Sequence, residues 1–243
     1  MTVRVGLLYR SGVDIDLGHG QTLTIRIPSV GEVLKCEDEY YSIVHSLTAM
    51  PVDMIVLLDD HGIDFSKINE YQLFIFLFGA IMKQDTKLIF GDFCFDGFEF
   101  AIDEKTGQPV YLDRKRDLVI DRTVQYKIAD ALRKIHHLEK NLRKPGNEEA
   151  RKYMIERARK KMARNRRRKK DSELERLIVA MVNTEQYKYD FEGTKNLSIY
   201  QFNESVRQVI KKVDYSNKMF GVYSGTINPK DLNQDDLNWL IHK

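Results

Sequence analysis

A concentrated basic segment constrains the fold of this chain more than any other feature. Between residues 143 and 170 the sequence carries fourteen Lys or Arg residues and only three acids, Glu148, Glu149 and Glu156. The whole chain has a net charge of +3, so the remaining residues sum to about −8. A mildly acidic protein with one basic element is expected to meet a polyanion or an acidic partner surface.

Three interpretations of the basic segment stay open. Residues 157–170 hold ten cations in fourteen positions, and helical spacing would point them to every face. A helix that reads DNA keeps one face for packing, and no aromatic residues interleave this run to stack on bases. Any contact with nucleic acid would therefore be made through phosphates and would not read sequence. The segment is a solvated linking helix, a surface for an acidic protein, or a sequence-blind nucleic-acid contact.

The first half of the chain predicts a mixed fold. Residues 3–9 and 22–27 are rich in β-branched and aliphatic side chains and flank a glycine-containing turn, which predicts a hairpin. Ser29 and Glu32 have capping-box spacing, so we expect a helix from there to about Met50.

The next segments continue this pattern. A short helix is expected from Pro51 to Leu58. The strongly apolar stretch 70–83 predicts a central buried helix, and short β-like runs between residues 87 and 120, separated by turns, predict a small antiparallel meander. These runs include 88–90 and 93–95.

The second half of the chain predicts helices. Asp121 is a plausible N-cap for a helix whose apolar residues repeat at three and four up to Leu138, and Pro145 and Gly146 would stop it. Asn147 would cap the next helix, which contains the basic run. Further helices are expected over 172–182, from Ser198 onward and over 219–223.

The expected fold class is therefore α+β. We predict an N-terminal mixed domain over residues 1–120, a helical connector with the long basic helix over 121–171, and a small all-α domain over 172–243. Cys36 and Cys94 match no metal spacing, and we interpret them as buried free thiols. The longest apolar run has ten residues, and the N-terminus lacks the form of a signal peptide, so we expect a cytosolic protein without a membrane segment.

Two motifs offer candidate catalytic or metal sites. His136 and His137 are adjacent on a predicted helix and point about 100° apart, so they cannot comfortably hold one metal, and we expect one ring in the core and one in solvent. Asp96, Asp113 and Lys115 resemble a Mg²⁺-dependent nuclease pattern. Because 31% of the residues are charged, an Asp-x-Lys triplet also arises by chance. We expect no cofactor, no metal site and no enzymatic activity, with the nuclease as the enzymatic alternative.

Segments 141–162, 198–209 and 235–240 resemble proteins encoded in tail-gene clusters of tailed phages and prophages of Gram-positive bacteria. The resemblance implies a non-enzymatic role. Such proteins are tail assembly chaperones, which bind the long tape-measure protein and keep its apolar helices soluble, or minor virion components. The resemblance assigns no catalytic residues to this chain.

The leading hypothesis is a chaperone-like phage tail assembly protein, in the host cytoplasm or the virion, that binds an elongated partner with a helical or acidic surface. A structural tail or baseplate component and a nucleic-acid-binding protein are the alternatives. Trp239 belongs to an apolar cluster that we expect to be buried, with a docking peptide as the alternative. The expected partner-binding residues are Tyr153, Met154, Arg157, Arg159, Lys160, Lys161, Met162, Arg164, Arg166, Arg167, Arg168 and Trp239.

Overall fold

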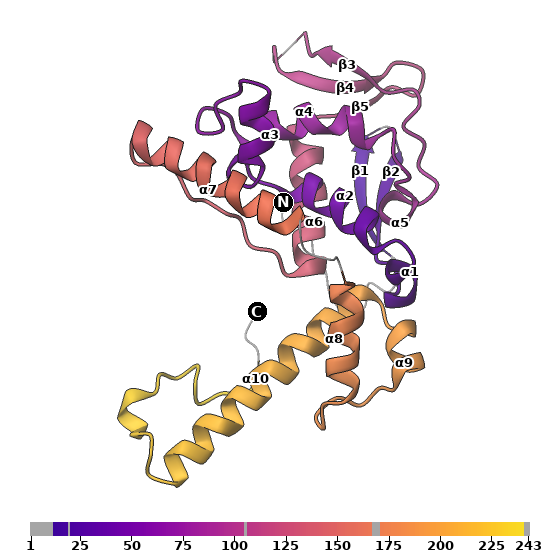
Figure 1. Cartoon of the computed structure of the whole chain (residues 1–243). Coiled ribbons are helices and arrows are strands. Elements are labelled where there is room, and N and C mark those ends of the chain that lie inside the picture. The colour runs from indigo at the N-terminus through magenta and orange to yellow at the C-terminus, as the bar shows by residue number, and fades with distance from the viewer. Residues whose placement is uncertain (1–11, 19, 105, 167–170, 241–243) are drawn as a thin grey trace. The chain divides into compact units, whose positions relative to one another are not determined.

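A computed structural model describes residues 12–18, 20–104, 106–166 and 171–240 of the chain (Figure 1). These residues form two compact units. The N-terminal unit contains the described residues up to Pro28 and from Lys35 to Ser172, and the C-terminal unit contains Ser29–Leu34 and the described residues from Glu173 onward. Helices dominate, beside one two-stranded and one three-stranded antiparallel sheet, so the predicted α+β class is confirmed.

The two-stranded sheet of the N-terminal unit pairs β1 (Gly12–Gly18) with β2 (Gln21–Arg26). Alternate residues face the core, and Ile15 lies opposite Leu23 with both side chains buried. The predicted strand over 22–27 and the turn before it are confirmed. The other predicted strand, 3–9, lies outside the described residues, and the observed partner of β2 is the segment that follows it.

The three-stranded sheet has the order β3 (Glu99–Ile102), β4 (Pro109–Asp113) and β5 (Leu118–Ile120). It confirms the meander from residue 99 onward. Residues 88–90 instead lie in the short helix α5 (Lys87–Phe90), and residues 93–95 lie in no strand. The predicted strands there are wrong because the aromatic rings of this stretch pack on one another: the Phe90 and Phe95 ring centroids are 5.1 Å apart.

The predicted single helix from Ser29 to about Met50 is also wrong. The capping box exists, since the Ser29 N–H donates to Glu32 Oε2 at 2.8 Å and the Glu32 N–H donates to Ser29 Oγ at 3.2 Å. The helix it starts, α1 (Val30–Leu34), ends after five residues. A separate helix, α2 (Glu37–Thr48), follows. The break has a physical reason: α1 packs in the C-terminal unit and α2 in the N-terminal unit.

The core of the N-terminal unit forms around two helices that the sequence predicted. The helix α4 (Glu70–Ile81) begins with an Asn69 capping box and buries Leu73, Phe74 and Phe78. The helix α6 (Arg122–His136) begins where the Asp121 carboxylate accepts the Val124 N–H at 2.8 Å, and it contacts both sheets and also α2 and α4. Figure 1 shows α6 running through the middle of this unit.

The helix α6 ends earlier than expected. His137 takes a left-handed conformation with φ 53°, and the Leu138 N–H returns to the Arg133 carbonyl at 2.8 Å. This terminates the helix well before Pro145, where the sequence had suggested the stop. The remaining chain up to Asn147 forms a connection without helix or strand.

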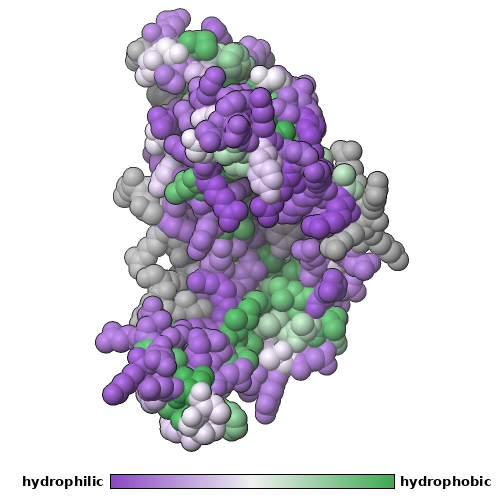
Figure 2. Space-filling model, turned by 60° about the vertical axis from the view of Figure 1, so that its left-hand side comes forward, coloured by the Kyte–Doolittle hydropathy of each residue, from purple (hydrophilic) through white to green (hydrophobic). Residues whose placement is uncertain are grey.

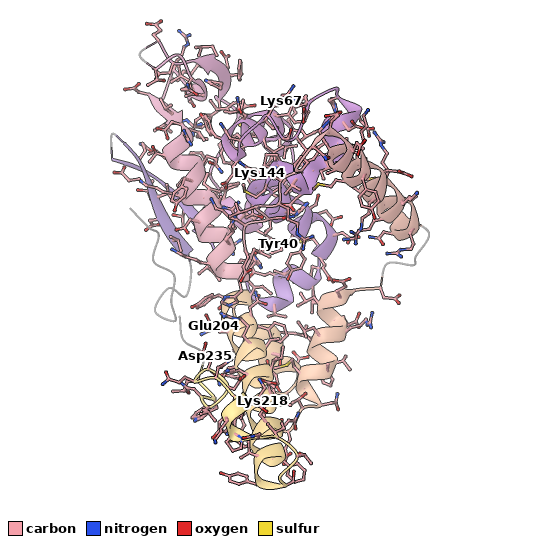
Figure 3. All side chains as sticks on the ribbon, turned by 90° about the vertical axis from the view of Figure 1, so that its left-hand side faces the viewer. Tyr40, Lys67, Lys144, Glu204, Lys218 and Asp235 are labelled. Atoms are coloured by element: carbon pink, nitrogen blue, oxygen red, sulfur yellow. The ribbon has the colours of Figure 1, made fainter. Side chains whose placement is uncertain are left out.

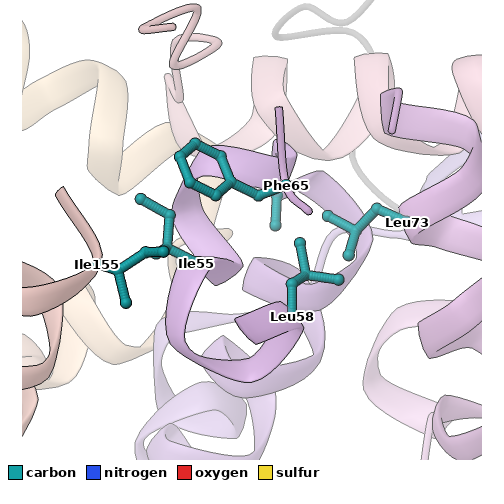
Figure 4. Close-up of a cluster of buried hydrophobic side chains, with 6 residues drawn as sticks. Ile55, Leu58, Phe65, Leu73 and Ile155 are labelled. Carbon is teal, nitrogen blue, oxygen red and sulfur yellow. The ribbon is translucent and has the colours of Figure 1, made fainter. Parts of the chain in front are cut away.

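A cluster of buried side chains joins the outer helices of the N-terminal unit (Figure 4). It lies among η1 (Pro51–Met54), α3 (Ile55–Asp60), α4 and α7 (Glu148–Arg166). The predicted short helix that begins at Pro51 is confirmed by η1 and α3. The cluster consists of Ala49, Ile55, Leu58, Phe65, Leu73 and Ile155.

The C-terminal unit is helical. It contains α1, α8 (Glu173–Val182), α9 (Phe191–Asn196), α10 (Ile199–Tyr223) and the short turn η2 (Pro229–Asp231). The predicted helices at 172–182 and from Ser198 are confirmed, but the second runs without interruption through the separate helix expected at 219–223. The helix α1 is integral to this unit, since Val30 and Val33 are fully buried and the Val30 N–H donates to the Leu197 carbonyl at 2.9 Å.

The predicted burial of the Trp239 cluster is wrong. Leu237, Trp239 and Leu240 are each about half exposed. The last described segment lies along α10 (Figure 3) and is held mainly by polar contacts: Lys218 Nζ lies 2.6 Å from Asp236 Oδ1, and Lys212 Nζ lies 4.9 Å from the Trp239 ring centroid. Figure 2 shows apolar side chains on the surface of this unit.

The cysteines differ from the prediction as well. Cys36 is half-buried, but Cys94 is exposed, so the expected burial is wrong for Cys94. Within the ranges that the structure describes, no helix is both long enough and apolar enough to cross a membrane.

Candidate partner-binding face of helix α7

The basic helix α7 is anchored by one apolar face. Its first turn is capped by Asn147, whose Oδ1 accepts the Ala150 N–H at 2.7 Å. Ile155 is only 9% exposed and belongs to the buried cluster, and Met154 and Ala158 pack against the same cluster. Because these three positions share one side of the helix, α7 has an inner face and an outer face.

Cations near the inner face pair with acids of the same unit. Arg159 Nη2 lies 2.6 Å from Asp59 Oδ2 and 2.5 Å from Asp60 Oδ1. Both acids lie in the last turn of α3, where the helix dipole is negative and a cation is favoured. Hydrogen bonds to these carboxylates raise the pKa of Arg159. Arg151 lies 2.6 Å from Glu148 Oε1 and 3.9 Å from Asp64 Oδ1.

The outer face of α7 has a different character. Tyr153, Arg157, Lys160 and Arg164 follow one another at intervals of four, three and four residues, which places them in one row along the helix. Lys161 lies beside this row. All five side chains are exposed, and Tyr153 is 63% exposed. We call these five residues the basic face.

Three cations of the basic face form no ion pair with a described acid of the N-terminal unit. Lys160 pairs with Glu156, with Nζ 2.6 Å from Oε1. Arg157, Lys161 and Arg164 form no ion pair with any residue in the described ranges. The charge that the sequence concentrates in this helix is therefore divided. Part of it docks α7 to α3, and part of it points into solvent beside an exposed aromatic ring.

The remaining predicted partner-binding residues are scattered. Met154 packs inward, and Met162 is 41% exposed on the inner side of the last turns, so neither lies with Tyr153 in one row. Arg167 and Arg168 lie outside the described residues, as does the side chain of Arg166. Trp239 belongs to the C-terminal unit.

Sequence reasoning missed Ile155, the residue that decides which face of α7 docks. The signal was present as apolar residues at 155, 158 and 162.

The nuclease pattern does not assemble into an open carboxylate site. Asp113 is 2% exposed, and its carboxylate accepts the Arg116 side chain at 2.5 Å and the backbone N–H groups of Lys115 and Arg116 at 2.9 and 3.1 Å. The hydrogen bond from Arg116 is the main reason that the pKa of Asp113 is lowered. Among the described residues, no group of three or more His, Cys, Asp or Glu side chains is placed to hold a metal ion.

The histidine pair does not divide between core and solvent as predicted. Both residues are half-buried. His136 Nε2 lies 2.9 Å from the Tyr40 hydroxyl, and its ring packs edge-on against Tyr40 and Tyr41. Desolvation of the ring, aided by repulsion from His137, lowers the pKa of His136 to about 4. His136 is therefore a structural residue at the end of α6, joined to α2 by the hydrogen bond between its Nε2 and the Tyr40 hydroxyl.

A family model matches part of the chain. Residues 166–242 match a family model described as the YomV second domain, which covers about a third of the chain. YomV is a protein of the SPβ phage and prophage region of Bacillus, so the match is consistent with a phage-related protein. Searches of curated proteins and of solved structures each returned no match. The matched segment coincides largely with the C-terminal unit, α6 precedes it, and α7 shares only Arg166 with it.

Proposed function

We propose that this protein is a non-enzymatic phage assembly factor that uses the basic face of α7 to bind an elongated, acidic helical partner. The observation that carries the proposal is the division of charge on α7. The inner cations pair with Asp59, Asp60 and Asp64, whereas Arg157, Lys161 and Arg164 remain available. The family match to a phage-region domain supports the phage context. The tape-measure protein is the partner that the sequence resemblance suggests.

The geometry of the face suits a helical partner. At 1.5 Å per residue, the row from Tyr153 to Arg164 spans roughly 16 Å, which equals about eleven residues of a second helix lying alongside. Acids spaced at three and four along such a helix would meet the cations in turn. Tyr153 offers a rigid amphipathic ring of the type enriched at binding hot spots. Cationic side chains at an exposed rim mainly accelerate encounter and select charge.

The proposal is tested by the triple variant Arg157→Glu, Lys161→Glu and Arg164→Glu. A matched control reverses three exposed cations elsewhere, Lys83→Glu, Arg114→Glu and Lys188→Glu, so both proteins have the same net charge. The probe is a fluorescently labelled acidic helical fragment of a phage tape-measure protein. We expect the triple variant to weaken binding by about tenfold or more and the control by much less. Equal losses in both variants would overturn the proposal.

The same titration separates a protein partner from nucleic acid. Duplex DNA bound through phosphates shows a linear fall of log K with log salt, with a slope of about −0.9 for each phosphate neutralised. If random-sequence DNA binds more tightly than the helical fragment at physiological salt, and the triple variant abolishes that binding, the basic face is a nucleic-acid contact instead.

A further inference from the structure

The N-terminal unit contains a cavity of about 470 Å³ that the proposed function does not use. It lies between η1, the first turns of α4 and α6, and the connection that links α6 to α7. Its volume falls within the range of about 300–1,000 Å³ that is usual for small-molecule sites. Its apolar lining, or floor, is formed by Met50, Pro51, Val52, Phe65, Ile68 and Tyr71, and polar side chains, among them the buried Gln125, line the rest of the wall.

The inner part of the cavity is lined by core residues. Pro51, Phe65 and Tyr71 are buried residues, and Phe65 also belongs to the cluster that anchors α7. The Tyr71 hydroxyl is engaged with the Pro109 carbonyl at 2.5 Å, so it presents its ring rather than a polar group to the cavity. The part of a ligand that contacts Pro51, Phe65 and Tyr71 is therefore expected to be apolar.

The mouth of the cavity is cationic. Its lining includes Arg122, Lys140, Arg143 and Lys144, all of them exposed. Figure 3 labels Lys144 on the connection that forms this edge. Lys140 is committed to Glu70, with Nζ 2.7 Å from Oε2. Within the described part of the chain, Arg122, Arg143 and Lys144 form no ion pair.

Glu70, the acid of the lining, does not cancel this charge. Its carboxylate lies 2.7 Å from Arg133 Nη2 and 2.7 Å from Lys140 Nζ, so two cations already neutralise it. Burial opposes ionisation of Glu70, but hydrogen bonds from Lys140 and Arg133 outweigh it and the pKa is lowered. The network leaves the mouth with an excess of positive charge.

The mouth is also held in place. Asn141 Nδ2 donates to Asp53 Oδ1 at 2.7 Å, and Lys140 reaches across to α4 through Glu70. These two contacts fix the connection over the cavity immediately before Arg143 and Lys144. Arg143 and Lys144 therefore lie on a segment that other contacts already hold in place. Less conformational entropy is then lost when a ligand binds.

We propose that this cavity binds an amphipathic carboxylate, with an unbranched or weakly branched apolar body on the floor and the carboxylate among the cations of the mouth. The separation of an apolar floor from an unpaired cationic mouth carries this assignment. A ligand with a cationic head group would meet repulsion from Arg122, Arg143 and Lys144. A neutral ligand would gain only the apolar contact.

The test is isothermal titration calorimetry of the full chain with decanoate, and with decanol and decylammonium as probes of equal chain length. We expect one saturable decanoate site per chain, weaker decanol binding, and decylammonium weaker than decanoate by about tenfold or more. Octanoate should bind more weakly than decanoate, by about fourfold for each methylene removed from the buried chain. No saturable decanoate binding, or equal binding of decanoate and decylammonium, would refute the assignment.

Two variants locate the site. Arg143→Glu with Lys144→Glu should abolish the preference for decanoate over decylammonium, because the charge of the mouth is reversed. Val52→Trp should fill the apolar floor and remove binding of all three probes, and circular dichroism checks that this variant folds. The triple variant of the basic face should bind decanoate as the wild type does. An unchanged preference in the Arg143 and Lys144 variant would contradict the proposal even if α7 binds a partner as proposed.

Discussion

The consecutive helices α6 and α7 have opposite relations to the same N-terminal unit. The helix α6 buries eight residues in fifteen, including Ile128, Leu132 and Ile135. Among the described side chains of the longer helix α7, Ile155 alone is buried, and many charged side chains surround it. Removing α6 would remove the centre of the core, whereas removing α7 would uncover one small cluster.

This difference separates a helix of the core from a helix that keeps a free outer surface. A helix that contributes to the core has little surface left for a partner, and α6 is such a helix. The helix α7 contributes just enough apolar surface and ion pairing to fix its orientation. The orientation of its outer side chains is therefore fixed, although they make few contacts that stabilise the unit. A partner-binding face requires side chains of this kind.

The largest expected effect comes from a truncation in α6. Leu132 is 1% exposed, so Leu132→Ala leaves a cavity in the core and should lower the free energy of unfolding by about 3 kcal/mol. Met162→Ala in α7 is the matched comparison and should be nearly neutral, because Met162 is 41% exposed. Urea denaturation followed by circular dichroism measures both. Similar losses in the two variants would remove the distinction between the helices.

A pH effect of nearly the same size should come from the end of α6. The pKa of His136 is about 4 in the folded protein, below its ordinary value of 6.5. The unfolded chain therefore binds a proton before the folded chain does. The stabilisation is complete above about pH 6.5 and falls as the pH drops toward 4, by roughly 3 kcal/mol in all.

Urea titrations at several pH values would show this slope, and His136→Gln should remove most of it. A wild-type stability that is flat between pH 6.5 and 4.5 would show that His136 is not desolvated as described. The cations of α7 are exposed, so the basic face should add salt dependence rather than a pH dependence in this range.

A smaller, local effect is expected at the contact that docks α7. Ile155→Ala should reduce amide protection of α7 by about tenfold or somewhat more, which corresponds to about 1–2 kcal/mol, because its buried contact is at the edge of the cluster. Protection of α6 should change little. Hydrogen exchange with mass spectrometry resolves the two helices, and an equal loss in both would mean that α7 is part of the central cooperative unit.

The smallest effect is expected from the ion pairs. Arg159→Gln removes the contacts to Asp59 and Asp60 but leaves Ile155 in place, and all three charged side chains are at least one-third exposed. Protection in α7 should fall less than in Ile155→Ala, and 1 M NaCl should reproduce the change in the wild type. A larger loss than for Ile155→Ala would show that charge, rather than apolar contact, docks the helix.

Local patterns predicted the parts of the fold that depend on neighbouring residues. Asp121 and the apolar spacing after it located the start of α6, and Asn69 and Ser198 cap their helices as such residues should. The end of α6 was missed because it depends on the left-handed conformation of His137, an uncommon choice for a residue other than glycine. The break between α1 and α2 was missed because it depends on which unit each helix packs in.

The candidate site was predictable only in part, for the same reason. The sequence indicated that α7 carries the excess charge, but it could not separate paired from unpaired cations. Asp59 and Asp60 are about a hundred residues from Arg159 in the chain, and only the folded unit brings them together. The cavity beside Lys144 likewise joins four segments that no local pattern connects.

The most direct test of the central claim compares binding and stability in one protein. The triple variant Arg157→Glu, Lys161→Glu and Arg164→Glu is titrated against the acidic helical tape-measure fragment and unfolded in urea beside the wild type. The account predicts an affinity reduced by about tenfold or more with an unchanged unfolding midpoint, because these side chains bind a partner and stabilise nothing within the unit. Unchanged affinity, or a loss of affinity that accompanies an equal loss of folded α7, would contradict it.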